Sequence, residues 1–307
     1  MIALEPGFLC GSYPPLVTPF RDGAVDYETY ASLVERQIAE GSHGIVVTGT
    51  TGEPSTLTNA ERIRLVEVAA RAAKRRIPVV AATGGQSHAD SIELTEAAKA
   101  AGAAAVLIVT PYFIRPPQRG LIEYYVDLGR RTELPVMIYH IPGRAAVNVT
   151  VDTVAAIAER LPRLVGLKHA FNDLNFVSEL LMRLGFEFRI HVGLEDLSFP
   201  MMAVGASGMM NAAGNIVPRK VAQLYELTAA GKMAEARALH FQLYELFAAI
   251  FYDTNPIPMK YMMKRLGLLP NEEHRLPMVP ATPELAKRLD AVLARAGLLP
   301  EGRAAAE

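Results

Sequence analysis

Two short runs of sequence decide the fold: PVMIYHIP at residues 135–142 and LVGLKHA at residues 164–170. Both are apolar along almost their whole length and rich in branched side chains, which is typical of strands buried on both faces of a parallel sheet. The segment at residues 151–160 lies between them and has the amphipathic pattern of a helix. Together the three segments predict one strand–helix–strand unit of a parallel sheet.

The same pattern occurs along most of the chain. Six further runs have the composition of buried strands and are bounded by Gly or Pro. They cover residues 15–19, 44–49, 78–84, 104–111, 189–193 and 208–214. The amphipathic segments between strands lie at residues 27–40, 59–75, 88–101, 121–131 and 175–184.

Eight strand–helix units predict an α/β fold of the closed (β/α)8 barrel type. The rival interpretation is a doubly wound open sheet, which usually has fewer strands and a phosphate- or dinucleotide-binding loop. The barrel is expected to fill residues 1–230, and a helical extension over residues 231–300 is expected to pack on it as part of one structural unit. The helical segments of this extension lie at residues 233–252, 258–268 and 283–296. We expect residues 301–307 to be a frayed tail.

Charge and cysteine content exclude several classes of protein. The chain has 31 Lys+Arg against 32 Asp+Glu, a formal net charge of -1, so we expect no nucleic-acid partner held by phosphate neutralisation. Cys10 is the single cysteine, which excludes an intramolecular disulfide and thiol-rich metal sites and fits a reducing cytoplasm. No run approaches the roughly 20 apolar residues that cross a bilayer. These observations predict a cytoplasmic protein without a membrane partner.

Lys168 stands out at the carboxyl ends of the strands, where a (β/α)8 barrel has its active site. An ammonium group in a barrel interior must be paired, neutralised or functional, because desolvation lowers the pKa of a lysine and makes its amine a better nucleophile. A lysine of this kind can form a Schiff base with a carbonyl substrate. The simpler interpretation is a strand-end lysine whose ammonium reaches solvent.

Two neighbouring features could assist such a lysine. Tyr139 ends the preceding strand and could move a proton near the same carbonyl carbon, although a strand tyrosine is more often part of the core. The segment Gly49-Thr50-Thr51-Gly52 offers backbone N–H groups and two hydroxyls, which suit a small carboxylate. Alone, this segment is equally compatible with an ordinary glycine turn.

A metal-dependent barrel enzyme is a second hypothesis, because His140, His169 and His191 fall near the ends of three successive strands. Strand alternation argues against it. If Tyr139 and Lys168 face the barrel interior, then His140 and His169 face the surrounding helices and the three imidazoles do not converge. Helix-facing histidines satisfied by local hydrogen bonds are the preferred interpretation.

At these residues the sequence resembles the dihydrodipicolinate synthase and N-acetylneuraminate lyase family of Schiff-base barrels. The segment at residues 49–53 is similar to the family's GTTGE loop, Tyr139 with Pro142 to its YxxP segment, and residues 166–168 to its G[IL]K lysine segment. The likeness covers nearly the whole chain, including the NPIPMK segment at residues 255–260.

The resemblance implies a role for each matching residue. Lys168 would form the Schiff base with the keto carbon of pyruvate or a related 2-keto acid, and Thr50 and Thr51 would hold its carboxylate. Tyr139 would shuttle protons, with Thr50 as its partner. Arg144 resembles the arginine with which the synthase branch binds the carboxylate of its aldehyde, and the sialic-acid lyase branch is not expected to have it.

Two further positions match residues that line the substrate floor, Gly193 and Met210. Phe113 stands where the family commonly has a second tyrosine that reaches into the neighbouring subunit's site, and Tyr112 precedes it. If the chain is extended there, Tyr112 points elsewhere. His169 replaces a typical glutamate of the synthases.

The resemblance therefore implies a lyase or synthase that condenses pyruvate, or a related 2-keto acid, with an aldehyde, for which aspartate semialdehyde is the leading candidate. The alternative within the family is an aldolase or dehydratase for a sugar-derived or hydroxylated 2-keto acid. A family member that binds a keto acid without catalysis is a third hypothesis, supported by Phe113. The expected reaction needs no cofactor and no metal, and the family implies a homotetramer.

Overall fold

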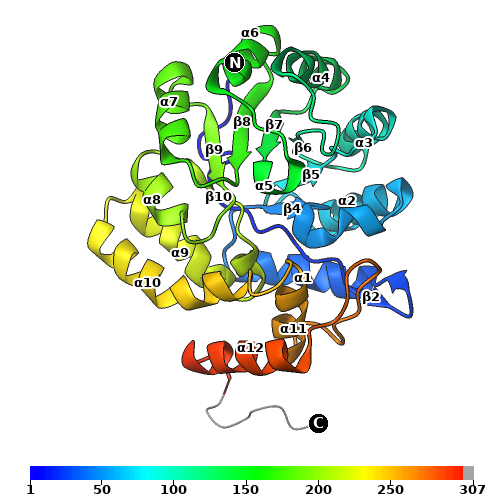
Figure 1. Cartoon of the computed structure of the whole chain (residues 1–307), viewed down its shortest axis with the longest axis vertical. Helices are drawn as coiled ribbons and strands as arrows, with labels where there is room; N and C mark the ends of the chain where they lie inside the picture. Colours follow the sequence, from blue (N-terminus) through cyan, green and yellow to red (C-terminus); the bar gives the residue numbers. More distant parts are fainter. Residues whose placement is uncertain (300–307) are drawn as a thin grey trace.

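The computed structural model describes residues 1–299, in which eight parallel strands form the centre and helices surround them (Figure 1). The strands are short and buried. They are β1 (Gly11–Ser12), β4 (Ile45–Val47), β5 (Val79–Ala82), β6 (Ala105–Val109), β7 (Val136–His140), β8 (Leu164–His169), β9 (Arg189–Val192) and β10 (Gly208–Met209). Seven of them lie within the runs predicted from the sequence.

Hydrogen bonding closes the sheet into a barrel. The strand order is β1-β10-β9-β8-β7-β6-β5-β4, and every adjacent pair is parallel. The remaining gap, between β4 and the chain that follows β1, is closed by a parallel bridge from Pro15 to Val46. The Leu16 N–H donates to the Val46 carbonyl there at 3.0 Å. The predicted (β/α)8 barrel is confirmed.

The first strand was predicted at the wrong place. The expected run at residues 15–19 is irregular apart from its bridge, and β1 lies a few residues earlier. Pro14, Pro15 and Pro19 have no N–H to donate, so this apolar run cannot sustain a ladder in the middle of a sheet.

Helices follow most strands, and several begin at a side-chain cap. Thr58 and Glu61 form a complete capping box on α2, and the Ser87 side chain accepts from the Asp90 N–H at the start of α3. The barrel helices are α1 (Tyr27–Ala39), α2 (Asn59–Ala73), α3 (His88–Ala100), α4 (Gln118–Arg130), α5 (Pro142–Ala145), α6 (Val151–Arg160), α7 (Leu174–Leu184), α8 (Ser198–Ala203) and α9 (Pro218–Ala229). The sequence pattern did not indicate α5, α8, α9 or the small hairpin of β2 (Phe20–Arg21) and β3 (Ala24–Val25).

A local irregularity in β8 sets which side chains face the barrel interior. Val136 pairs with Leu164, but Met137 pairs with Gly166, so Val165 is an extra residue in the ladder. A Cβ on Gly166 would lie 2.3 Å from the Arg189 carbonyl oxygen, which explains the glycine. Beyond this shift Tyr139 and Lys168 are partners.

The helical extension comprises α10 (Met233–Ala249), α11 (Ile257–Arg265) and α12 (Pro283–Arg295). In this structure α10 contacts α8 and α9, and α11 contacts the 3-10 turn η3 (Ala212–Asn215) that follows β10. We propose that barrel and extension form one structural unit. The predicted frayed tail, residues 301–307, lies outside the described residues. Within residues 1–299, no helix combines the length and apolarity that a membrane crossing needs.

Candidate active site

Lys168 lies near the carboxyl end of β8 with its side chain inside the barrel, where the residue is only 4% exposed. Its Nζ lies 4.3 Å from the centre of the Tyr139 ring on β7. On the other side its Cε packs against the Gly193 backbone, since a Cβ built on Gly193 would lie 2.8 Å from that carbon. Two neighbouring strands therefore fix the position of the amine.

The Tyr139 hydroxyl and the Thr50 Oγ1 lie 3.2 Å apart, within hydrogen-bonding distance. Thr50 begins the 3-10 turn η1 (Thr50–Gly52), which follows β4 on the far side of the barrel mouth. This contact links two residues that are 89 positions apart in sequence. A phenol paired with a second hydroxyl can pass a proton in either direction.

Thr51 is oriented from the C-terminal extension. The Asn255 side-chain amide donates to its Oγ1 at 2.9 Å, and both residues are buried. Because the Thr51 oxygen accepts this bond, its own proton is directed elsewhere and is available to a carboxylate. The first N–H groups of η1 also have no partners within the turn.

The end of the threonine loop is held by a buried ion pair. Glu53 follows η1 in the left-handed conformation, with φ of 54°, and its Oε1 lies 2.5 Å from the Lys260 Nζ of α11. The His274 Nδ1 lies 3.3 Å from the other carboxylate oxygen. Burial lowers the pKa of Lys260, and the Glu53 carboxylate opposes this shift.

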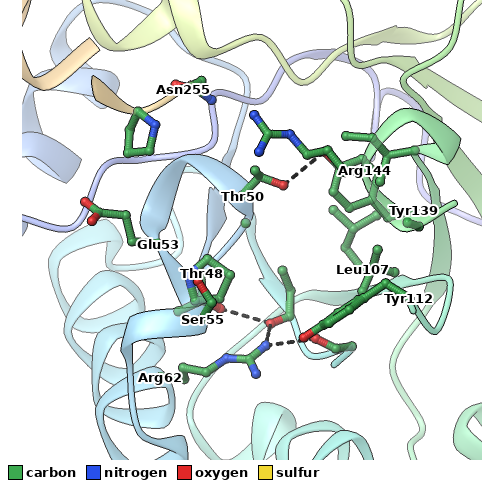
Figure 2. A pocket seen from close by; sticks show the side chains of 18 of the residues that line it. Thr48, Thr50, Glu53, Ser55, Arg62, Leu107, Tyr112, Tyr139, Arg144 and Asn255 are labelled. Carbon is green, nitrogen blue, oxygen red and sulfur yellow. Dashed lines mark hydrogen bonds between the residues drawn. The ribbon is translucent and has the colours of Figure 1, made fainter. Parts of the chain in front are cut away.

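Two adjoining cavities meet at these residues. The Lys168 cavity has a volume of about 210 Å³ and the Arg62 cavity about 320 Å³. The residues that line both are Thr50, Tyr139, Ile141, Arg144 and Asn255. In Figure 2, Thr50, Tyr139 and Arg144 lie in the upper part of the view, and Arg62 and Tyr112 lie below them.

The Lys168 cavity brings together all seven residues to which the resemblance gave a catalytic or binding role. They are Lys168, Tyr139, Thr50, Thr51, Arg144, Gly193 and Met210. The exposed Arg144, on the short helix α5, lies at the junction of the two cavities. The arrangement places a buried amine, a pair of hydroxyls and a guanidinium around one small space.

Comparison with known proteins agrees with this geometry. The model of the dihydrodipicolinate synthetase family matches residues 9–296. The chain belongs to this family. The predicted family and the predicted class of enzyme, a lyase of the Schiff-base type, are both confirmed.

Individual members of the dihydrodipicolinate synthetase family resemble the chain over almost its full length. A 4-hydroxy-tetrahydrodipicolinate synthase of Thermus thermophilus is 45% identical and covers 96% of this chain and 99% of its own. The crystal structure of dihydrodipicolinate synthase from Aquifex aeolicus has a TM-score of 0.92 at 38% identity, covering 94% of this chain and 98% of its own. A monomeric dihydrodipicolinate synthase variant has a TM-score of 0.92 at 34% identity, covering 96% and 99%.

Phe113, the position at which the resemblance implied a tyrosine, is 81% exposed and lines neither the Lys168 cavity nor the Arg62 cavity. Its φ is 77°, so the chain is not extended at this position. Tyr112 lines the Arg62 cavity with Tyr139 and Arg144. The turn therefore separates the two aromatic residues.

The three histidines do not converge, although one of them departs from the expectation. His140 and His169 lie outside the barrel against Phe176 of α7, with their Nδ1 atoms 3.1 Å apart. His191 instead pairs with Lys168 across β8 and β9 and packs edge-on against Tyr13 inside the barrel. Among residues 1–299, no group of three or more His, Cys, Asp or Glu side chains is placed to hold a metal ion.

Two charged residues of the site were missed by the sequence analysis. Glu195 lines the Lys168 cavity and is only 2% exposed. Arg62, on α2, lines the second cavity and donates to the carbonyls of Ala82 and Gly84 at 2.8 and 3.2 Å. Burial lowers the pKa of Arg62 to about 10. Each residue has another charged residue within two positions along the chain, and nothing in the pattern separates it from a surface charge.

Proposed function

We propose that this enzyme condenses pyruvate with aspartate semialdehyde through a Schiff base on Lys168. The observation that carries the proposal is the buried Lys168 amine beside the Thr50–Tyr139 hydrogen-bonded pair, in a cavity that Arg144 also lines. The printed names of the relatives, 4-hydroxy-tetrahydrodipicolinate synthase, support the same reaction.

Binding and activation of the keto acid use the residues around Lys168. The Thr50–Thr51 turn receives the pyruvate carboxylate, and the free amine of Lys168 attacks the keto carbon. Loss of water gives an imine whose positive nitrogen draws electrons from the methyl carbon. Tyr139, paired with Thr50, removes a methyl proton and gives the enamine.

The second substrate enters from the Arg62 cavity, where Arg144 binds its carboxylate. The enamine carbon attacks the aldehyde carbon, and Tyr139 supplies the proton that the new alkoxide needs. Hydrolysis of the imine releases the product and restores the Lys168 amine. An aldehyde with its own carboxylate fits Arg144 better than a neutral aldehyde.

A panel of aldehydes incubated with pyruvate tests the proposal. We expect turnover with aspartate semialdehyde and much slower turnover with neutral aldehydes of the same length. Cleavage or dehydration of a hydroxylated 2-keto acid would instead favour the aldolase alternative. Pyruvate binding without turnover of any partner would favour a non-catalytic keto-acid-binding protein.

The cellular compartment and the oligomeric state of the enzyme are each proposed from one observation. The single cysteine supports a reducing compartment, so we propose that it works in the cytoplasm. The exposed apolar side chains of Phe113 and Ile114 support association with further copies, and we propose the tetramer implied by the family.

A further inference from the structure

Glu195 is a buried carboxyl group in the Lys168 cavity with one oxygen unused. It follows β9 by three residues, and its Oε1 accepts the backbone N–H of Ala212 at 2.6 Å. Its Oε2 is buried and has no hydrogen-bond partner within residues 1–299. An unpaired carboxyl oxygen is costly in such a place unless it takes part in the chemistry of the cavity.

The surroundings of Glu195 make it a group that can gain and lose a proton. Burial raises its pKa to about 7, and the backbone N–H groups of Ala212, Glu195 itself and Ala213, together with the charge of Lys168, oppose this shift. The other titratable or charged side chains that line the cavity are Tyr139 and Arg144. The segments that cover it, which follow β10 and α10 or belong to η3, contribute uncharged residues, among them Met210, Ala212 and Phe251.

We propose that Glu195 is the acid–base partner of Lys168, accepting the proton that the ammonium loses before attack and returning it to the hydroxyl that leaves as water. The inference rests on the proposed function, because it assigns a step of the same Schiff-base reaction. It gives Glu195 a catalytic role beside Tyr139, which moves protons at the substrate carbons.

Atoms and charges balance through this step. The Lys168 ammonium gives one proton to Oε2, and its lone pair attacks the keto carbon while the C=O electrons move to oxygen. Transfer of a second proton from nitrogen to that oxygen leaves a neutral carbinolamine. The Glu195 acid then protonates the hydroxyl, water leaves, and the nitrogen lone pair forms the C=N bond. A carboxylate again faces a cation, so the buried site has the same net charge before and after.

A purely structural role would not need an acid at this position. Capping the Ala212 N–H uses Oε1 alone, and a glutamine amide oxygen could accept the same bond. Burying a carboxyl group in the same cavity as an amine is useful when the proton itself moves. Glu195→Gln therefore separates the two roles, because it retains the cap and removes the proton site.

The test is reductive trapping of the full-length protein with pyruvate and cyanoborohydride between about pH 5.5 and 8.5, followed by peptide mass analysis of Lys168. In the wild type we expect the trapping rate to rise through about pH 7, as Glu195 becomes able to accept a proton. Glu195→Gln should slow trapping at neutral pH by about 10²-fold or more and remove this step from the profile. Glu195→Asp should recover part of the trapping rate and part of the step in the pH profile. The exposed neighbour Asp196→Asn is the matched control and should behave as the wild type.

Each outcome decides the matter. A Glu195→Gln protein that traps pyruvate at the wild-type rate with the wild-type profile overturns the inference. If Glu195→Gln does not fold, the wild-type profile decides alone, and its lack of a step between about pH 6 and 8 overturns the inference. If the folded wild type gives no adduct on Lys168 at any pH, the proposed function itself has failed, which is a different result.

Discussion

Lys168 and Arg144 are proposed to act on different substrates, so their substitution should affect different steps of the reaction. Lys168→Ala should abolish reductive capture of pyruvate. Arg144→Ala should leave capture unchanged and lower kcat/KM for the aldehyde about 10²-fold, because it removes a charge-assisted hydrogen bond worth roughly 1.5–3 kcal/mol. Trapping by mass analysis and initial rates at varied aldehyde measure the two effects. Equal losses on both substrates in Arg144→Ala would contradict the division.

Gly193 is proposed to leave room for the Lys168 amine. A Cβ at this position would lie 2.8 Å from both the Lys168 Cε and the Ala170 Cβ. Gly193→Ala should therefore displace the amine and slow pyruvate trapping at least about tenfold, since small displacements of reacting groups are costly. Gly143→Ala is the matched control, because its Cβ would meet nothing within 4 Å. A wild-type rate of pyruvate trapping in Gly193→Ala would show that the Lys168 side chain can move aside without loss of reactivity.

The site residues that could be predicted from sequence were those whose residue type differs from that of their neighbours along the chain. Lys168 could be found because a charge interrupts an apolar run, and the glycine-rich turn could be found beside it. Glu195 could not, because the pattern does not separate it from its exposed neighbour Asp196. The difference between them is burial, which depends on how the loop after β9 returns over η3.

At the scale of the elements, the strands hold neutral histidines whose burial makes stability depend on pH. Burial lowers the pKa of His169 to about 4 and of His191 to about 3, from 6.5. Below about pH 6.5 the unfolded chain binds protons that the folded chain cannot, so stability is lost as the pH falls. Each group contributes a loss of about 2 kcal/mol between pH 7 and 5.

A variant isolates this contribution, because the raised pKa of Glu195 works in the opposite direction over the same range. His191→Leu should reduce the loss of stability between about pH 7 and 5 by roughly 2 kcal/mol relative to the wild type. Urea unfolding at the two pH values measures the difference. An equal loss of unfolding free energy between the two pH values in both proteins would mean that His191 titrates normally in the folded state.

The Glu53–Lys260 pair joins the loop after β4 to α11, and both side chains are buried. Lys260→Met alone should cost about 3–5 kcal/mol, because it leaves a buried carboxylate without its cation. Glu53→Gln combined with Lys260→Met should be much less destabilised than the single variant. Urea unfolding of the wild type, both single variants and the double variant measures the coupling. Additive effects would show that the pair is not coupled.

Sequence pattern located most elements, and its failures have physical causes. Runs of branched and small apolar residues marked seven strands correctly, since such runs suit burial on both faces. The first strand was misplaced because apolar character outweighed the missing donors of its prolines. The interior position of His191 goes with its pairing to Lys168 across β8 and β9, and inter-strand register is not visible in a single sequence.

At the scale of the whole molecule, the turn after β6 presents an apolar surface at the barrel mouth. Phe113 and Ile114 are 81% and 61% exposed. Side chains of this kind are expected to be covered by another copy of the chain. Ile114→Asp should therefore lower the mass of the assembly, measured by light scattering or sedimentation. Met182→Asp, at an apolar residue on α7 that is 84% exposed, is the matched control. A wild-type protein that is already a monomer would contradict the proposal.

The buried contact between Glu53 and Lys260 also bears on how the enzyme matures during synthesis. The threonine turn leaves the ribosome early, but Asn255 and Lys260, which orient it, are made only after the whole barrel. Until Asn255 and Lys260 dock, a nascent or prematurely terminated chain would have its lysine nucleophile but no ordered binding site for the carboxylate of the keto acid. Chains that end before Asn255 and Lys260 should therefore be inactive toward the keto acid, because the threonine turn is oriented only after these two residues have been made.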